Sequence, residues 1–475
     1  MPSPSATTLR TRPKIVYVTS GAAGMYCGSC LNDNTVARQW SRDGIDVQLV
    51  PTYTPIRTDD RDVSGERLFF GGIQVYLEQK FPWFRYAPRW LRRLVNSPRV
   101  IRWATARAIQ TDARDLGALT VSMLQGDQGR QQVDCEELCD WLAAERPDAV
   151  LLSNMLIAGF VPRLRQKLNC AVLVTLQGDD IFLDSLPEPY RGQALAELRR
   201  LAPSIDRFVT HSRYYADFMA SFADLPRGRM TVVPLGIDTR DFTLPAGDAL
   251  PMGDTLPAAD TLPVAVVGRA GAVGVGRRAG RRIGYFARLA PEKGLHQLVE
   301  AFIRLKEQPE FADCELWIAG WLGAHRRDYA AEQWQRLQAA GLEGQFQYFG
   351  ELSRSQKVTF LRELDIFSVP TTYQEPKGLF VLEALAAGVP VVLPRHGAFP
   401  ELLESVGGGC LFEPGDVASL TEQLTELLRD RARREQLAAS GQQAVVDHRS
   451  VAVTSRELLQ LIQEVIPSRE VGLVG

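Results

Sequence analysis

Two cations in the C-terminal half of the chain have the type and spacing to bind a diphosphate. Arg288 and Lys293 lie in the stretch ARLAPEKG, directly after a β-rich run and before a helical pattern. A loop of this kind suits a diphosphate, because charge-assisted hydrogen bonds to phosphate are strong. Taken alone, however, the loop fits a solvated surface turn, with Lys293 merely near a helix start, better than a diphosphate site.

Two carboxylates follow in the stretch EPKGLFVLE, at Glu375 and Glu383. The helix predicted to start near Gly378 offers free amide groups that can hold a phosphate. Glu383 lies further into this helix, within the otherwise apolar VLEALAAG, where an unpaired buried charge would be costly. A carboxylate at that place can accept hydrogen bonds from two ribose hydroxyls, and the alternative is an ordinary surface glutamate.

The elements that must position these residues alternate between short apolar runs and helical patterns. A first series has strand-like runs at 14–20, 45–51, 148–153, 171–176, 207–212 and 230–236, with a glycine-dense stretch at 21–28 and a helical segment at 31–42. A second series contains RRIGYFARL, ELWIAG, FQYFG, LDIFSVP and VPVVLP. Such alternation predicts parallel sheets, so we expect an α/β protein of two Rossmann-like domains with a ligand cleft between them.

Composition limits the class of protein. A chain of 475 residues suggests two or three domains. Its 54 Lys and Arg against 56 Asp and Glu residues give a net charge of −2, so we expect no nucleic-acid partner. Seven cysteines fit a reducing compartment, and we find neither a secretory signal nor a run of eighteen apolar residues. These features favour a cytoplasmic protein, with peripheral contact at the inner membrane face as an open alternative.

Two segments stand apart from the α/β pattern. Between the two series, Leu-Pro recurs every six residues from Leu244 to Pro263, and an Ala/Gly/Val/Arg stretch follows, which predicts a flexible linker insertion over 244–282. The segment 80–107 carries eight Lys and Arg residues with interleaved aromatic residues and no acid. This pattern fits contact with anionic lipid or an anionic acceptor, and equally a helical insert with a solvated basic face.

Four ordered motifs in the C-terminal half resemble those of the retaining GT-B glycosyltransferases of family 4. The family signature runs from G-R-L-x-x-x-K-G through E-x-F-G-x-x-x-x-E and A-x-G-x-P-V-V to G-G-x-P-E. This chain has ARLAPEKG, EPKGLFVLE, ALAAGVPVV and GAFPE in that order, followed by CLFEPGD. It departs from the pattern at Lys377, where the family has an aromatic residue, and at Ala398, where the family has glycine.

The resemblance implies a donor site and a mechanism. Arg288 and Lys293 would hold the donor diphosphate, Glu375 would contact hydroxyls of the donor sugar, and these three are the expected catalytic residues. Glu383 would bind the nucleotide ribose. The expected donor-binding set is Gly28, Arg288, Lys293, Glu375, Gly378, Leu379 and Glu383. The implied reaction is retaining and front-face, in which the departing phosphate accepts the proton of the acceptor.

The N-terminal half resembles the family less closely. Gly28 falls on the second glycine of the family's first loop, and PLGIDTRDF resembles the motif at the domain junction. TLQGDDIF resembles T-x-H-G-x-D, with Gln177 in place of a histidine associated with the acceptor side. Gln177 can donate an amide hydrogen bond but does not take a proton. Gln177, Asp180 and His211 are therefore the candidate acceptor-side residues.

Two further patterns suggest other chemistry. Cys27 and Cys30 form a CxxC sequence, which at the N-terminus of a helix is typical of thioredoxin-like redox sites. No thioredoxin-like arrangement follows it, and no second CxxC is present to complete a zinc site. We therefore favour a backbone turn beside the phosphate. The sequence Asp60-Arg61-Asp62 is formally a D-x-D, which metal-dependent transferases use, but it lies in a polar loop. No histidine pair has a metal-ligand spacing, so we expect no metal and no cofactor besides the nucleotide sugar substrate.

We therefore predict a GT-B fold with an N-terminal acceptor-side domain (1–243), the linker insertion (244–282), a nucleotide-sugar-binding domain (283–455) and a segment (456–475) that returns to the N-terminal domain. The predicted function is metal-independent transfer of a sugar to a glycan, lipid or small molecule with retention. The alternatives are a GT-B sugar-nucleotide epimerase or phosphorylase, a non-catalytic nucleotide-sugar-binding protein, and a redox protein that depends on Cys27 and Cys30.

Overall fold

A computed structural model describes residues 12–21, 28–56, 58, 61–65, 69, 113–243 and 280–467. The chain divides into two compact units. The first contains residues 1–211, 216–233 and 454–475, and the second contains 212–215 and 234–453. The basic segment 80–107, Cys27, Asp60 and the Leu-Pro repeats lie outside the described residues.

The first unit is built on a six-stranded sheet in the order β2-β1-β3-β4-β5-β6, with every neighbouring pair parallel. Its strands are β1 (Lys14–Thr19), β2 (Asp46–Pro51), β3 (Ala149–Leu152), β4 (Ala171–Thr175), β5 (Arg207–Thr210) and β6 (Met230–Val232). The central strands β3 and β4 are buried along their whole length, as their continuous apolar runs require when helices cover both faces of a sheet.

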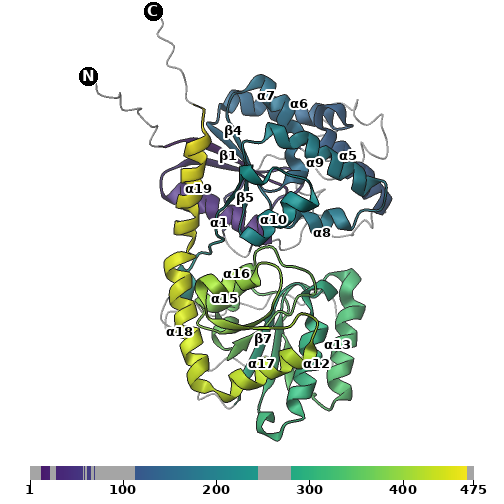
Figure 1. Cartoon of the computed structure of the whole chain (residues 1–475), viewed down its shortest axis with the longest axis vertical. Coiled ribbons are helices and arrows are strands. Elements are labelled where there is room, and N and C mark those ends of the chain that lie inside the picture. The colour runs from purple at the N-terminus through teal and green to yellow at the C-terminus, as the bar shows by residue number, and fades with distance from the viewer. Residues whose placement is uncertain are drawn as a thin grey trace, which may run out of the picture. The chain divides into compact units, whose positions relative to one another are not determined.

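Helices pack on both faces of this sheet (Figure 1). They are α1 (Gly28–Arg42), α5 (Ala113–Gln125), α6 (Gln132–Glu145), α7 (Val161–Lys167), α8 (Asp179–Asp184), α9 (Tyr190–Leu201), α10 (Arg213–Phe222) and α19 (Val451–Val465). From Thr454 onward, α19 belongs to the first unit, although it is the last helix of the chain. The indole Nε1 of Trp40 on α1 donates a buried hydrogen bond of 2.9 Å to the carbonyl of Ser455 on α19.

The second unit has a parallel six-stranded sheet in the order β12-β11-β10-β7-β8-β9. Its strands are β7 (Arg282–Phe286), β8 (Glu315–Ala319), β9 (Phe346–Tyr348), β10 (Ile366–Phe367), β11 (Val391–Pro394) and β12 (Gly409–Phe412). Because β7 begins at Arg282, the last residue assigned to the linker insertion already belongs to the sheet.

The helices of the second unit surround one hydrophobic core that includes Ile283, Phe302, Ile318, Phe367 and Val392, all fully buried. They are α11 (Arg240–Thr243), α12 (Leu295–Lys306), α13 (Arg327–Ala339), α14 (Arg354–Arg362), α15 (Leu379–Ala386), α16 (Phe399–Val406), α17 (Val417–Arg429) and α18 (Arg431–His448). Two parallel-sheet units covered by helices confirm the predicted fold class of two Rossmann-like domains.

Candidate active site

The loop between β7 and α12 carries the two predicted cations, and a close backbone approach sets its path. Gly294 has φ of +72°, and a Cβ added there would lie 1.7 Å from the carbonyl oxygen of Pro370. Only glycine fits such a position without displacing backbone. The residue before it, Lys293, is thereby held against the loop that follows β10.

The ammonium group of Lys293 contacts two side chains of the loop that follows β10. Its Nζ lies 2.8 Å from Oε2 of Glu375 and also donates to the hydroxyl of Tyr373, which in turn donates to the same carboxylate. The ammonium lies 4.7 Å from the centroid of the Tyr373 ring and 5.3 Å from that of Phe380. The side chains of Lys293 and Glu375 are only 14% and 5% exposed, so this is a largely buried ion pair.

Glu375 is ionised in this setting. Burial raises the pKa of its carboxyl, but the charge and hydrogen bond of Lys293 and the hydrogen bond of Tyr373 outweigh burial, so the pKa is net lowered. The backbone of Glu375 is held as well, because its carbonyl accepts a 2.8 Å hydrogen bond from the amide of Ala398. Ala398, where the family pattern has glycine, thus supplies a backbone donor to Glu375.

Arg288 takes a different position from Lys293. It is exposed and forms its ion pair with Glu292, at 2.8 Å between Nη2 and Oε1, on its own loop. Its charge still reaches the neighbouring group, because Arg288 partly offsets the burial and the Glu375 charge that raise the pKa of Tyr373. The structure thus brings Lys293 and Glu375 into direct contact, whereas Arg288 pairs with Glu292 and acts on Tyr373 through its charge.

The start of α15 holds the two predicted amide donors. Gly378 is buried, caps the helix in the left-handed region with φ of +74°, and its amide donates a long hydrogen bond of 3.4 Å to Oε1 of Glu375. Leu379 is the first residue of the helix and is partly buried. The Gly378 amide and the Lys293 ammonium therefore donate to the two oxygens of the same Glu375 carboxylate.

Glu383 lies one turn further along α15 and is 4% exposed. Its Oε1 accepts a 2.5 Å hydrogen bond from Nζ of Lys357 on α14, which is 1% exposed. The apolar surroundings of Glu383 had indicated that its charge needs a partner. The partner itself, Lys357, was not predicted from the sequence.

The first unit contains a second buried polar cluster, around Asp33 on α1. This fully buried carboxylate accepts hydrogen bonds from the Tyr17 hydroxyl at 2.6 Å, from Thr19 Oγ1 at 2.9 Å and from Gln177 Nε2 at 3.0 Å. Burial, followed by the Asp33 charge, raises the pKa of Tyr17 well above its usual value. The donors come from β1 and from the segment after β4, so the cluster ties α1 to the carboxyl ends of these strands.

Gln177 uses its amide nitrogen within this cluster. Nε2 donates both to Asp33 and, at 3.0 Å, to the carbonyl of Ser153. An amide NH₂ has two hydrogens, so both hydrogens of Gln177 are donated to groups of the protein.

The other predicted residues of the first unit are spread over its elements. Gly28 is exposed at the first position of α1, Asp180 is buried near the start of α8, and His211 follows β5 with its Nδ1 2.9 Å from the Val233 carbonyl. The Asp33 cluster was not predicted, although the three consecutive polar residues Asn32, Asp33 and Asn34 near the start of a predicted helix could have indicated it. All three are buried in the structure.

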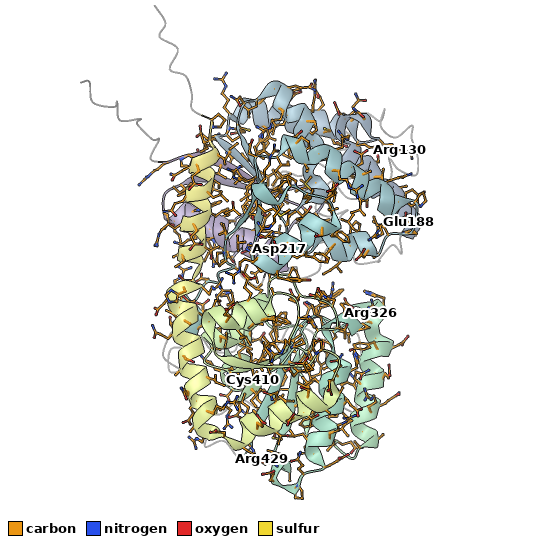
Figure 2. The ribbon with its side chains drawn as sticks, viewed as in Figure 1. Arg130, Glu188, Asp217, Arg326, Cys410 and Arg429 are labelled. Carbon is orange, nitrogen blue, oxygen red and sulfur yellow. The ribbon has the colours of Figure 1, made fainter. Side chains whose placement is uncertain are left out.

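The described cysteines are buried except for the half-buried Cys410 on β12. Figure 2 labels Cys410 within the second unit. Cys30 of the CxxC lies inside α1, with Thr19 Oγ1 4.0 Å from its Sγ. Among the described residues, no group of three or more His, Cys, Asp and Glu could hold a metal ion. None of the helices described here is long and apolar enough to cross a membrane.

Comparison with known families places both halves of the chain. Residues 278–444 match the model for glycosyl transferases group 1, and residues 126–241 match that for glycosyltransferase family 4. The second described sheet and its helices are thus similar to the glycosyl transferases of group 1, and part of the first unit is similar to glycosyltransferase family 4.

Solved structures show the same architecture. Sucrose-phosphate synthase from Thermosynechococcus elongatus superposes with a TM-score of 0.63 at 16% identity, covering 95% of this chain and 98% of that one. Anabaena Alr3699/HepE in complex with UDP and glucose gives a TM-score of 0.62 at 16% identity, covering 95% of this chain and all of that one (100%). The two units therefore have the GT-B fold.

Curated relatives match over part of their length. The phosphatidyl-myo-inositol mannosyltransferase of Mycobacterium leprae is 33% identical over 169 residues, 35% of this chain and 42% of the relative. A GDP-mannose-dependent phosphatidylinositol monomannoside mannosyltransferase of Corynebacterium glutamicum is 30% identical over 184 residues, 37% of this chain and 45% of the relative. The matched region thus spans less than half of these relatives.

Proposed function

We propose that the chain transfers a glycosyl group from a nucleoside diphosphate sugar to an acceptor, with retention at the anomeric carbon and without a metal ion. The observation that carries the proposal is the buried Lys293–Glu375 pair, which sits where two loops of the matched family segment meet. A buried ion pair with aromatic walls is a costly arrangement for stability alone. It suits a site that must hold a cation ready for a diphosphate.

Lys293 is the residue proposed to stabilise the leaving group. An ammonium has three donors, so Lys293 can bond a phosphate oxygen while it keeps Glu375. Arg288, exposed on the same loop, supplies the second cation, and the amides of Gly378 and Leu379 add dipoles at the start of α15. Such preorganised charge stabilises a transition state more than a ground state when negative charge develops on the departing diphosphate.

Glu375 is proposed to orient the transferred sugar by accepting hydrogen bonds from its hydroxyls. Lys293 and Tyr373 hold one oxygen of this carboxylate, which favours a fixed acceptor over a nucleophile. In the front-face reaction, the bond from C1 to the diphosphate oxygen breaks and a bond from C1 to the acceptor oxygen forms on the same face. The proton of the acceptor hydroxyl passes to the departing diphosphate.

The acceptor is proposed to be a glycan, a lipid or a small molecule. Two curated relatives are named for phosphatidylinositol acceptors, which supports the lipid alternative. The basic and aromatic sequence of 80–107 fits peripheral contact with an anionic membrane. Gln177, Asp180 and His211 are proposed to lie on the acceptor side.

The experiment that tests the proposal is incubation with a panel of nucleoside diphosphate sugars, with and without candidate acceptors. We expect one donor to release its nucleoside diphosphate, and NMR of the product to show the anomeric configuration of the donor. Binding without turnover would favour a non-catalytic binding protein, and interconversion of the donor sugar an epimerase. An inverted product would refute retention.

Metal independence is the first prediction. Asp62 of the D-x-D sequence uses Oδ1 to accept a 2.7 Å hydrogen bond from the amide of Ser64, as a turn residue does. We expect the transfer rate to stay within about twofold of its initial value in excess EDTA, since side chains and amides supply the positive charge. Loss of activity in EDTA that Mn²⁺ or Mg²⁺ restores would contradict this proposal.

A further inference from the structure

Lys357 and Glu383 form an ion pair that is deeper than the Lys293–Glu375 pair. Their side chains are 2% and 5% exposed, and Nζ lies 2.5 Å from Oε1. Lys357 comes from α14 and Glu383 from α15, two helices that pack against each other. The ring of Phe286, at the end of β7, lies 5.7 Å from the ammonium.

Packing alone does not call for charges at this place. The neighbours on the two helices, Val358, Leu361 and Leu382, are buried and apolar. Removing two charges from water is costly, and apolar side chains of similar volume often serve stability as well or better. The pair therefore has a cost that folding does not explain, and it lies one turn inside the helix whose start is proposed to meet the donor phosphates.

We infer that Lys357 is a positioning residue that keeps the Glu383 carboxylate ionised and oriented to accept hydrogen bonds from the ribose hydroxyls of the nucleotide. This inference rests on the proposed function, in which Glu383 contacts the ribose. The ammonium holds the carboxylate at Oε1, so the plane of the group is set before a ligand arrives. A charged acceptor bonds a hydroxyl about twice as strongly as a neutral one.

The consequence is that discrimination between ribose and 2′-deoxyribose depends on a lysine that does not touch the ligand. Without the cation, burial favours the protonated form of Glu383, and the side chain loses its fixed orientation. A protonated or rotated carboxyl group accepts more weakly from the 2′-hydroxyl. The affinity for the ribonucleotide then falls toward that for the deoxyribonucleotide.

The test is calorimetric titration of the full chain with UDP, GDP and ADP and with their 2′-deoxy counterparts. For the diphosphate that the wild type binds, we expect the deoxy form to bind about 10- to 150-fold more weakly, as loss of a hydrogen bond to a charged group implies. In Lys357→Met we expect this ratio to fall below about threefold, because the charge of the acceptor is lost. Lys357→Gln keeps a donor without the charge and should give an intermediate ratio.

A matched control separates positioning from folding. Val358→Ala, at the neighbouring buried position of α14, should lower the melting temperature and leave the ribose-to-deoxyribose ratio unchanged. If Lys357→Met does not fold, the ratio in Lys357→Gln decides the question.

The two possible failures are distinguishable. An unchanged or larger ratio in the Lys357 variants, beside a wild type that discriminates, overturns the inference and leaves the proposed function standing. A wild type that binds none of the three diphosphates overturns both. A wild type that binds a diphosphate without discrimination overturns the ribose contact of Glu383, and with it the role of Lys357.

Discussion

At the scale of single residues, Lys293, the cation proposed to meet the diphosphate, is paired with a carboxylate of the protein itself. Lys293 is held by Glu375 and Tyr373 and lies over two aromatic rings, so its position is set before a diphosphate binds. Preorganisation of this kind lowers the cost of ordering a flexible lysine in the transition state.

Lys293→Ala should lower kcat/KM by about 10- to 1,000-fold, since a hydrogen bond to a charged group contributes about 1.5–3 kcal/mol and more charge develops in the transition state. We expect kcat itself to fall, in steady-state kinetics with the donor found by the panel. Arg304→Ala on α12 removes the same charge from an exposed i,i+4 pair and should change kcat/KM by less than about twofold. Normal turnover of Lys293→Ala would show that the assigned donor site is wrong.

The same substitution should reverse how Glu375 affects stability as the pH changes. In the wild type its pKa is net lowered, so its contribution to stability is present above its usual pKa and is lost as the pH falls through the lowered value. Without Lys293, burial dominates and raises that pKa. The test therefore measures the free energy of unfolding of both proteins by chemical denaturation at pH 7 and at pH 5. Between pH 7 and pH 5, Lys293→Ala should become more stable relative to wild type, because protonation removes the unpaired buried charge of Glu375. The absence of this relative gain would mean that water solvates the Glu375 carboxylate in the variant.

Site residues that belong to a sequence motif were predicted as candidates, whereas residues that act through contacts between two separate elements were not predicted. Lys293, Glu375 and Glu383 were predicted together as one site, and the structure places Lys293 against Glu375. Tyr373, Lys357 and Asp33 were not predicted. Their roles arise from contacts between separate elements, which neither hydrophobic periodicity nor motif spacing encodes.

At the scale of elements, Gly294 connects the path of a loop to the position of Lys293. In Gly294→Ala a side chain would be forced into the left-handed region and onto the Pro370 carbonyl. We expect the free energy of unfolding to fall by at least about 2 kcal/mol, because backbone strain and displacement add. Diphosphate binding should weaken as well, since Lys293 moves with the loop.

Gly341 provides the control for this prediction. It also has a positive φ, +71°, but a Cβ there meets no heavy atom within 4 Å. Gly341→Ala should therefore cost only the conformational strain, about 1 kcal/mol, with unchanged diphosphate affinity. Equal effects of the two substitutions, measured by urea denaturation and calorimetry, would show that the close approach to Pro370 does not matter.

The bounds of strands with long apolar runs were predicted closely, whereas those of short strands were not. The expected run 171–176 became β4, Ala171–Thr175, because a buried parallel strand is apolar throughout. The run LDIFSVP shortened to β10, Ile366–Phe367, because the following segment leaves the sheet to form the loop that carries Glu375. The edge strand β12 was not predicted, since its residues Gly409–Phe412 are only partly buried and include glycine.

At the scale of the whole molecule, the first unit contains both ends of the chain, and the second unit consists mainly of residues 234–453. Residues from Thr454 belong to the first unit, and Figure 1 shows their helix, α19, at the C-terminal end of the ribbon. Ile462 on this helix is fully buried, and Trp40 of α1 donates to Ser455. The sequence had suggested a return from about residue 456, by resemblance alone. Its physical consequence is that the stability of the N-terminal sheet depends on the last helix of the chain.

Ile462→Ala tests this dependence. Removing a fully buried isoleucine should cost about 2–5 kcal/mol, and the loss should fall on the first unit. Hydrogen exchange followed by mass spectrometry should therefore show faster exchange in β1 and β3 and unchanged exchange in β7 and β8. Leu428→Ala on α17, buried in the core of the second unit, should produce the opposite pattern. If Ile462→Ala instead weakened protection equally in all four strands, the two units would unfold as one cooperative body, and the C-terminal helix would stabilise the whole molecule rather than the unit it joins.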